Sequence, residues 1–454
     1  MEATELTGYA AGQGPDLVTS QLSGKNVLVL YNETQTFTST VFEHLDSLAR
    51  HSRARVFFAH QDHRTPVADF ARFDAVIIHY SIRLPFDQIA EPTATALAAF
   101  RGLKVLFIQD EYDHTRRAWH WIQRLGIRLV FSSVPEPSMG RVYPPSEFPN
   151  VRFVSNLTGY APEELATVGP RRPPSERPLK IGYRGRPLPI RYGALGKEKT
   201  EIGRLVKTYC ESAGVEHDIG WEESDRLYGD DWYDFIASCR AVLGSESGSN
   251  VFDWDGTLPA QIEAYRAAHP GASERDLYDA IIAPLDLHGL MNQVSSRVFE
   301  AIACRTALVL FEGDYSGVVQ PDRHFIPLRR DGQNLPEVIE RLRDGAAVDA
   351  MTERAFDEVL AGGTYGYEAF VRMVDAEIAK AMASLEDCGE PRPAASFETP
   401  GVVIRTRPHR FRLVRDPIVV QAAKQAAQGL APYVPVTIKD VIKDWIRRML
   451  PPAG

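Results

Sequence analysis

The sequence has little that would mark a membrane, secreted or disulfide-rich protein. None of its apolar runs approaches the roughly 18 residues of a membrane span; the longest compact runs are NVLVLY and TALVLF. The first residues, MEATELTGYAAGQGPD, lack the basic start and apolar stretch of a secretory signal. The 4 cysteines are widely spaced and form no C-x-x-C pair. We therefore expect a cytoplasmic protein in a reducing compartment.

Positive charge is also scarce for a protein that would bind nucleic acid. The chain has 454 residues, with 51 Lys and Arg against 60 Asp and Glu, and a formal net charge of −9. A general nucleic-acid binder usually has a basic balance, so we expect no nucleic-acid partner. The apolar fraction of 44% and the charged fraction of 24% are ordinary for a globular protein. The length predicts two or three domains.

Several catalytic motifs are missing as well. There is no H-E-x-x-H and no G-x-x-x-x-G-K-[ST]. The stretch GSESG has Glu246 where a serine hydrolase needs serine, and GYRGRP lacks the third glycine of a dinucleotide-binding motif. Asp253-Trp254-Asp255 has the D-x-D form that chelates a metal-bound diphosphate in one class of sugar transferase, but that class has a single domain. We expect neither a bound metal nor a cofactor.

The remaining sequence has the pattern of an α/β protein. Short apolar runs alternate with helical segments, which predicts parallel strands buried on both faces of a sheet. In the first half these runs are 26–31, 54–60, 75–80, 104–109 and 127–133. After a stretch rich in proline and arginine, the alternation restarts with 179–183. We expect two tandem Rossmann-like domains facing a cleft, where ligands of such sheets bind.

The composition divides the chain into five parts. We expect a flexible tail at 1–24, a first domain at 25–165, a linker at 166–178, a second domain at 179–385 and a basic C-terminal extension at 386–454. Within that extension, 436–450 predict an amphipathic basic helix. This helix either docks on the protein's own surface or makes peripheral contact with the inner face of a membrane.

A basic turn in the second domain has the features of a diphosphate site. Arg184 and Arg186 follow the strand at 179–183, and Gly185 stands between them. Lys197 and Lys199 lie near the start of the next expected helix, 196–214. Backbone N–H groups at a helix N-terminus favour anions, and arginine can bind phosphate oxygens in pairs. A solvated basic turn is the alternative interpretation.

The segment NQVSSRVFEAIACRTALVLFEGDYSGVVQPDRHFIPL resembles bacterial glycosyltransferases of the GT-B architecture, of the group 1 or family 4 type. Members commonly have S-P-R-x-F-E-A-x-A-C-G-T before a strand and a loop. This chain has a serine where proline is common and Arg305 where glycine is usual. The residues that match are Ser296, Arg297, Phe299, Glu300, Ala301, Ala303, Cys304 and Thr306. The resemblance covers about 179–385, and the first domain only through its architecture and the phrase QDEYDH.

This resemblance implies a glycosyltransferase that moves a sugar from a nucleoside-diphosphate sugar, for example a UDP-sugar, to an acceptor hydroxyl in glycan or polysaccharide biosynthesis. The acceptor would be a glycan, a lipid-linked molecule or a small molecule. It also implies that Glu300 hydrogen-bonds the ribose hydroxyls and that the last helix crosses back to the first domain. The expected donor-binding residues are Arg184, Gly185, Arg186, Lys197, Lys199, Glu246, Ser296, Arg297 and Glu300.

Two features leave the chemistry at the sugar open. Retaining members often have a second glutamate eight residues before the ribose-binding one, and Asn292 stands there in this chain. The stereochemical outcome therefore stays open. Glu246 or Asp253 either contacts the donor sugar or caps the next helix.

The loop after the strand at 104–109 holds the candidates for a catalytic base. Three carboxylates and an imidazole are crowded there, at the end of a strand that should face the cleft. Crowded acids raise one another's pKa, which prepares a base near neutral pH. Alternatively, Asp113 caps the following helix while its neighbours face solvent. The candidate catalytic residues are Asp110, Glu111, Asp113 and His114, with Asn32, Glu33, His79 and Tyr80 as weaker candidates.

Two other function classes share this domain plan. A nucleotide-sugar epimerase would bind the same donor and act without an acceptor. A non-catalytic partner of a glycan assembly enzyme would keep the fold, and the departures from the family pattern at Asn292 and Arg305 leave that alternative open.

Overall fold

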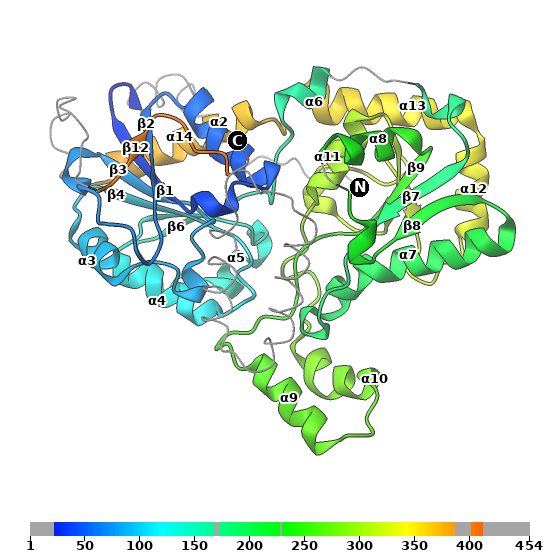
Figure 1. Cartoon of the computed structure of the whole chain (residues 1–454), viewed down its shortest axis with the longest axis horizontal. Helices are drawn as coiled ribbons and strands as arrows, with labels where there is room; N and C mark the ends of the chain where they lie inside the picture. Colours follow the sequence, from blue (N-terminus) through cyan, green and yellow to red (C-terminus); the bar gives the residue numbers. More distant parts are fainter. Residues whose placement is uncertain (1–21, 168–171, 228, 386–400, 412–454) are drawn as a thin grey trace.

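The computed structural model describes residues 22–167, 172–227, 229–385 and 401–411. Most of the expected tail, and all of the amphipathic helix expected at 436–450, lie outside these ranges. In the described ranges, no helix has the length and apolar character needed to span a membrane. Two α/β domains stand side by side (Figure 1). The predicted fold class, an α/β protein with two tandem Rossmann-like domains, is thus confirmed.

The first domain is built on a sheet that has seven strands in the described chain, in the order β12-β2-β1-β3-β4-β5-β6. The strands from β1 to β6 pair in parallel, and β12 pairs with β2 in the antiparallel direction. The strands are β1 (Asn26–Tyr31), β2 (Arg55–His60), β3 (Ala75–Ile78), β4 (Leu103–Ile108), β5 (Leu129–Ser132), β6 (Arg152–Ser155) and β12 (Ile404–Arg405).

Alternate residues of these strands supply two cores, one on each face of the sheet. On β1, Val27 and Val29 pack into one core, and Leu28 and Leu30 pack into the other. Helices α2 and α14 cover the valine side, and α3, α4 and α5 cover the leucine side. These helices are α2 (Ser39–His51), α3 (Glu91–Ala99), α4 (Thr115–Leu125), α5 (Glu136–Val142) and α14 (Tyr367–Ala383).

The second domain has a parallel sheet that contains, among the described residues, five strands in the order β11-β10-β9-β7-β8. They are β7 (Lys180–Arg184), β8 (Glu216–Gly220), β9 (Ala241–Gly244), β10 (Ala307–Phe311) and β11 (Ile326–Leu328). Helices α8 and α11 pack on one face, and α7, α12 and α13 on the other. They are α7 (Gly193–Ala213), α8 (Asp230–Ser238), α11 (Ser296–Ala303), α12 (Leu335–Arg343) and α13 (Gly345–Ala355).

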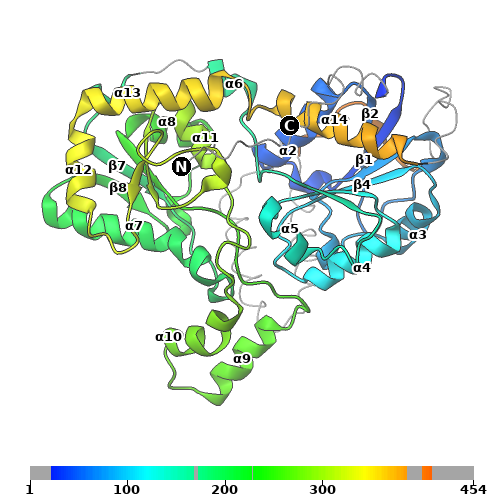
Figure 2. The ribbon, with the colours of Figure 1, turned by 180° about the vertical axis from the view of Figure 1, so that it is seen from behind.

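A long segment between β9 and α11 joins the two domains. It includes α9 (Leu258–Ala268) and α10 (Glu274–Leu277), which project away from both sheets (Figure 2). Before α9, its backbone pairs with the loop after β4: Asp253 N–H donates to Tyr112 O at 2.8 Å, and Arg116 N–H donates to Trp254 O at 2.9 Å. The second domain is therefore bound directly to the loop in which a catalytic base is expected.

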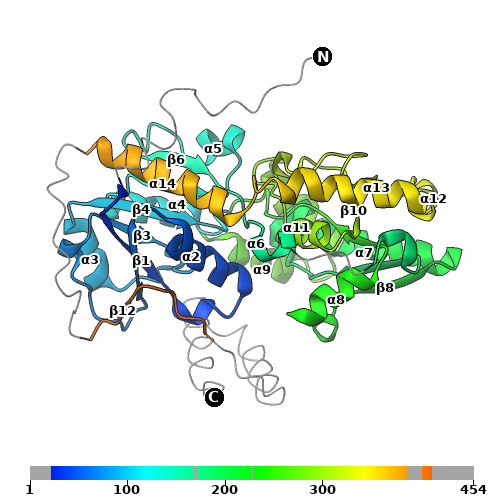
Figure 3. The same cartoon turned by 90° about the horizontal axis from the view of Figure 1, so that it is seen from above.

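The last described segments return to the first domain. Helix α14 packs against α2, β4 and β5 (Figure 3), as the resemblance implies for the last helix. The expected second domain at 179–385 therefore ends in a helix that belongs to the core of the first. Residues 401–411 follow the same domain: Arg405 forms an ion pair with Glu33, and His409 N–H donates to Tyr31 Oη at 2.9 Å. Between the two sheets, the short helix α6 (Glu163–Thr167) precedes the linker.

Two histidines are buried between the first sheet and α14. His79 Nε2 lies 3.1 Å from His44 Nδ1, and the two side chains are at most 2% exposed. The ring of His44 contacts those of Phe107 and Phe370. Burial lowers the pKa of His44 to about 3, and burial together with the charge of His44 lowers the pKa of His79. Both imidazoles are neutral in the folded protein at neutral pH.

The histidine pair should make stability depend on pH. The unfolded chain takes up protons on these residues near pH 6.5, whereas the folded chain does not until much lower pH. Below pH 6.5 each should therefore lower the free energy of unfolding by about 1.4 kcal/mol per pH unit. Denaturant unfolding at pH 7.5, 6.5 and 5.5 measures this slope. His44→Gln should reduce it and the same change at exposed His120 should not; equal slopes in both variants would contradict the assignment.

Candidate functional site

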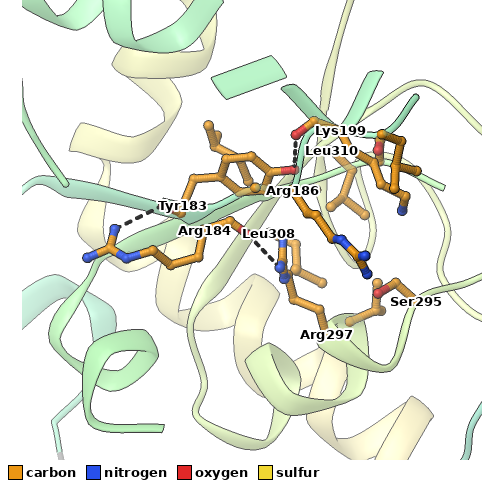
Figure 4. Close-up of a pocket in the computed structure, with 14 residues that line it drawn as sticks. Tyr183, Arg184, Arg186, Lys199, Ser295, Arg297, Leu308 and Leu310 are labelled. Carbon is orange, nitrogen blue, oxygen red and sulfur yellow. Dashed lines mark hydrogen bonds between the residues drawn. The ribbon is translucent and has the colours of Figure 1, made fainter. Parts of the chain in front are cut away.

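The carboxyl ends of β7 and β9 border a cavity of about 250 Å³. The sheet order switches direction between these two strands, because the chain runs from β7 to β8 on one side and returns to β9 on the other. Such a switch point leaves a crevice that ligands of parallel sheets occupy. We call it the cation cavity, after Arg186, Lys199 and Arg297, which line it (Figure 4).

The cations of this cavity come from three elements. Arg186 lies in the loop after β7, Lys199 lies in α7, and Arg297 lies in the first turn of α11. Arg186 is exposed and has no hydrogen bond or ion pair with any residue that the structure describes. Lys199 Nζ donates to Ser247 Oγ at 3.0 Å. Arg297 donates to the backbone oxygen of Arg184 at 2.7 Å, which fixes its direction.

The positive charges of the cavity repel one another. Burial, assisted by the charges of Arg297 and Arg186, lowers the pKa of Lys199 to about 8. Of the described residues that line the cavity, none is acidic. A bound anion would relieve this repulsion and would be held by charge-assisted hydrogen bonds.

The N-terminus of α11 also reaches the cavity. Ser295, Arg297 and Val298 line it, and the side chain of Ser295 does not cap the helix. The N–H groups of a first helical turn lack intrahelical acceptors and carry part of the positive end of the helix dipole. They add to the preference of the cavity for an anion.

Gly185 and Arg184 also line the cavity, but neither directs a positive charge into it. A Cβ atom on Gly185 would lie 2.8 Å from Lys199 O and 2.9 Å from a Tyr183 ring carbon, so the close approach of β7 to α7 requires glycine. The Arg184 guanidinium extends away from Arg186 and Arg297 (Figure 4). It packs 4.1 Å from the centre of the Phe235 ring and forms a 2.8 Å ion pair with Asp218.

The structure corrects the expected start of the helix after the basic turn. Helix α7 begins at Gly193, before the expected 196–214, and its first-turn Ala194 N–H donates to the carboxylate of Asp286 at 2.7 Å. The N-terminus of α7 is thus already bound by the carboxylate of Asp286, whereas the N-terminus of α11 has no side-chain cap. Lys197 lies outside the cavity lining and is exposed, with a 3.9 Å ion pair to Glu201.

Glu300 lies one turn beyond Arg297 on α11, outside the cation cavity itself. It accepts a hydrogen bond from Trp232 Nε1 at 2.8 Å, and burial raises its pKa. The guanidinium of Arg297 lies 5.2 Å from the centre of the Trp232 ring, so Trp232 contacts both residues. Ser296 also lies outside the lining of the cavity. Its Cβ instead faces Gly159, which lies between β6 and α6.

Glu246 and Asp253 are held by contacts within the protein. Glu246 accepts from Asn292 Nδ2 at 2.5 Å and from Tyr315 N–H at 2.8 Å, directly behind the wall of the cation cavity. Asp253 accepts from the backbone N–H of Thr257 and Leu258, which caps α9. Of the two alternatives for Asp253, the structure therefore shows the cap.

The four expected catalytic residues of the first domain do not lie together in an open site. Glu111 is fully buried and accepts from Ser132 Oγ at 2.6 Å and Ser133 N–H at 2.9 Å. Burial raises its pKa to about 7, and its Oε1 is used by these two contacts with the end of β5. Asp110 is exposed and accepts from Tyr112 Oη at 2.6 Å.

Asp113 and His114 are covered by the segment from the second domain. Asp113 is 4% exposed and forms an ion pair with Arg191, which follows β7. Burial lowers the pKa of His114, and its Nδ1 has no hydrogen-bond partner among the described residues. Gly256 lies directly against this nitrogen, where any Cβ would clash. The four side chains that the sequence predicts to crowd together are therefore separated. Glu111 lies in a buried core, Asp113 and His114 lie at the contact between the domains, and Asp110 is exposed to solvent.

Several residues near the site have no signal in the sequence. Trp232 lies on a short helix with no motif, and Tyr183 resembles any buried strand residue. Asp286 lies in the long segment before α11 and reaches α7 only through the fold. A contact between elements so distant in sequence has no periodicity or spacing that could indicate it.

No protein-family model and no curated protein matches the sequence. Among solved structures, an α-glucosyltransferase in complex with UDP-glucose and DNA is 10% identical over 78% of this chain and 99% of its own, with a TM-score of 0.44. HepE of Anabaena in complex with UDP and glucose is 12% identical over 79% and 100%, with a TM-score of 0.43. TM-scores below 0.5 are too low to transfer a function to this chain.

The Arg191–Asp113 pair should contribute more to stability than the exposed Arg116–Asp255 pair, which also joins the two domains. It joins a buried carboxylate, whereas Arg116 and Asp255 are largely exposed. Arg191→Met should lower the free energy of unfolding by about 3 kcal/mol, since it leaves buried Asp113 with the more distant Arg83, at 4.0 Å, as its cationic partner. Arg116→Met should cost less than about 1 kcal/mol. Urea unfolding of both variants gives the comparison, and equal losses would contradict it.

Proposed function

We propose that this protein is a glycosyltransferase that uses a nucleoside-diphosphate sugar, with the diphosphate bound in the cation cavity. The observation that carries the proposal is the meeting of Arg186, Lys199 and Arg297 with an uncapped helix N-terminus at the switch point of a parallel sheet. Guanidinium and ammonium groups are the usual ligands of phosphate oxygens.

The cavity suits the leaving group of such a transfer. As the bond between the sugar and the diphosphate breaks, negative charge grows on the phosphate oxygens. Cations and N–H dipoles that are already fixed at that place stabilise this charge without having to reorganise. Arg186 is the cation with most freedom to do so, because it has no other partner in the described chain.

Glu300 is placed to bind the ribose in this proposal. It lies one helical turn from Arg297, and a carboxylate can accept from two vicinal hydroxyls. Its present partner, Trp232 Nε1, uses one oxygen and leaves acceptor capacity on the carboxylate. The acceptor would enter from the first domain, and a glycan, a lipid-linked molecule and a small molecule all remain candidates, as does a membrane contact through 436–450.

Nucleotide binding tests the proposal directly. A ligand that binds only the folded protein raises its melting temperature, so UDP, GDP, dTDP and CDP should be compared in a thermal-shift assay. At least one should stabilise the protein, and Arg186→Ala should weaken its binding by about tenfold or more. Lys197→Ala is the matched control and should bind normally. The absence of any nucleotide effect would refute the proposal, and sugar isomerised on the nucleotide rather than transferred would favour the epimerase.

The lowered pKa of Lys199 predicts a pH dependence of this binding. Lys199 is charged below pH 8 and loses its proton above it, so nucleotide affinity should fall between pH 8 and pH 9.5. The diphosphate itself stays ionised over that range. Lys199→Arg keeps its charge there and should bind equally at both values. A wild-type protein with constant affinity would show that Lys199 does not contact the ligand.

A further inference from the structure

A second cavity, of about 470 Å³, lies between the two domains. Helix α2 of the first domain supplies one wall, and α6, α8 and the end of α11 supply the others. Figure 3 shows α2, α6 and α11 at the boundary between the domains. Phe42, Leu165 and Tyr233 give it apolar and aromatic surface, and Glu43 and Arg410 face it with opposite charges. We call it the interdomain cavity.

Helix α11 connects the two cavities along one of its faces. Arg297 lines the cation cavity and Cys304 lines the interdomain cavity. Glu300 lies between them at spacings of three and four residues, so the three residues share one face. At 1.5 Å per residue the two ends are about 10 Å apart along the helix. A molecule with phosphates at Arg297 and ribose at Glu300 would thus extend its base toward the interdomain cavity.

Electrostatic interactions support the placement of phosphates, ribose and base in that order along α11. Burial and then the charge of Glu300 raise the pKa of Glu43 across the domain boundary, and burial followed by the charges of Glu300 and Glu43 raises the pKa of Tyr233. Glu43 and Tyr233 line the interdomain cavity, and Glu300 is close enough to act on both through its charge. On α8, Tyr233 is the neighbour of Trp232, which already contacts Glu300 and Arg297.

Glu43 is the half-buried acid of this cavity without an assigned partner. It has no hydrogen bond or ion pair with a described residue. Asp46 and Glu164 also line the cavity, but both are paired with Arg50. Burial and the charge of Glu300 raise the pKa of Glu43 to about 7, while Arg410 and Arg50 oppose that shift and Glu164 adds to it.

Arg410 also lines the cavity, and its charge acts on Glu43 without an ion pair within 4.0 Å in the described chain. Its guanidinium lies 4.9 Å from the centre of the Phe42 ring and donates to Ser39 Oγ at 3.3 Å, with no carboxylate partner among the described residues. The cavity thus offers a hydrogen-bond acceptor and a donor next to aromatic surface.

We propose that the interdomain cavity receives the nucleobase of the donor and that Glu43 selects guanine there. This inference rests on the proposed function. Guanine presents two adjacent donors, the ring N–H and the amino group, which a single carboxylate accepts together. Its neighbouring carbonyl oxygen suits Arg410. Uracil offers one N–H donor between two carbonyl oxygens, and a carboxylate repels those oxygens. Cytosine offers one amino group beside an acceptor nitrogen.

Calorimetric titration of the full chain with GDP, UDP, CDP and inosine diphosphate tests this proposal. GDP should bind at least about tenfold more tightly than UDP or CDP. Inosine diphosphate lacks the amino group and should also bind more weakly than GDP. Glu43→Gln should lose about tenfold or more in GDP affinity and little in UDP affinity. Glu163→Gln, a nearby acid outside the cavity lining, is the control and should leave both unchanged.

The outcomes separate this inference from the proposed function. If no nucleotide binds, the proposed function itself fails. If nucleotides bind but GDP and UDP do so equally, or Glu43→Gln binds GDP normally, the base lies elsewhere and Glu43 does not select it. The comparison of GDP with inosine diphosphate uses the wild-type protein, so the proposal can be overturned even if the variant does not fold.

Discussion

Mutual repulsion among fixed positive charges is the constraint around which the second domain is organised. Arg186, Lys199 and Arg297 meet where the strand order switches, in a lining that has no acid among its described residues. Burial and, after it, the charges of Arg297 and Arg186 lower the pKa of Lys199. Folding places these charges together against their repulsion, and an anionic ligand removes the cost. The chemistry of the ligand is therefore implied by the charge pattern.

The contact between the domains decides which residues can act. Backbone hydrogen bonds join the segment around Asp253 to the loop after β4, and Arg191 binds Asp113 across the same boundary. These contacts bury Asp113 and partly cover His114. On the other side of the boundary, α2 and α11 leave the interdomain cavity between them. One side of the domain boundary therefore holds the two domains together, and the other side leaves a cavity that a ligand could enter.

Local patterns predicted most of the strands and the basic turn. Runs such as 26–31 and 306–311 are buried on both faces, so their composition is itself the signal. The short strand β6 was not predicted, because its four residues are only partly buried. Among the site residues, Arg186, Lys199 and Arg297 come together as the sequence suggests. Their roles in binding stay predictions.

The sequence could not determine where each side chain points or which residues it contacts. Arg184 and Arg186 are equivalent in the motif, yet the guanidinium of Arg184 is held on Phe235, whereas Arg186 has no hydrogen bond or ion pair in the described chain. Glu43 gave no signal, because its surroundings come from the second domain. The chain alone determined the two parallel sheets, since hydrophobic periodicity is a local property. Only the tertiary structure decided which charges face a cavity, because burial and pairing depend on residues hundreds of positions away.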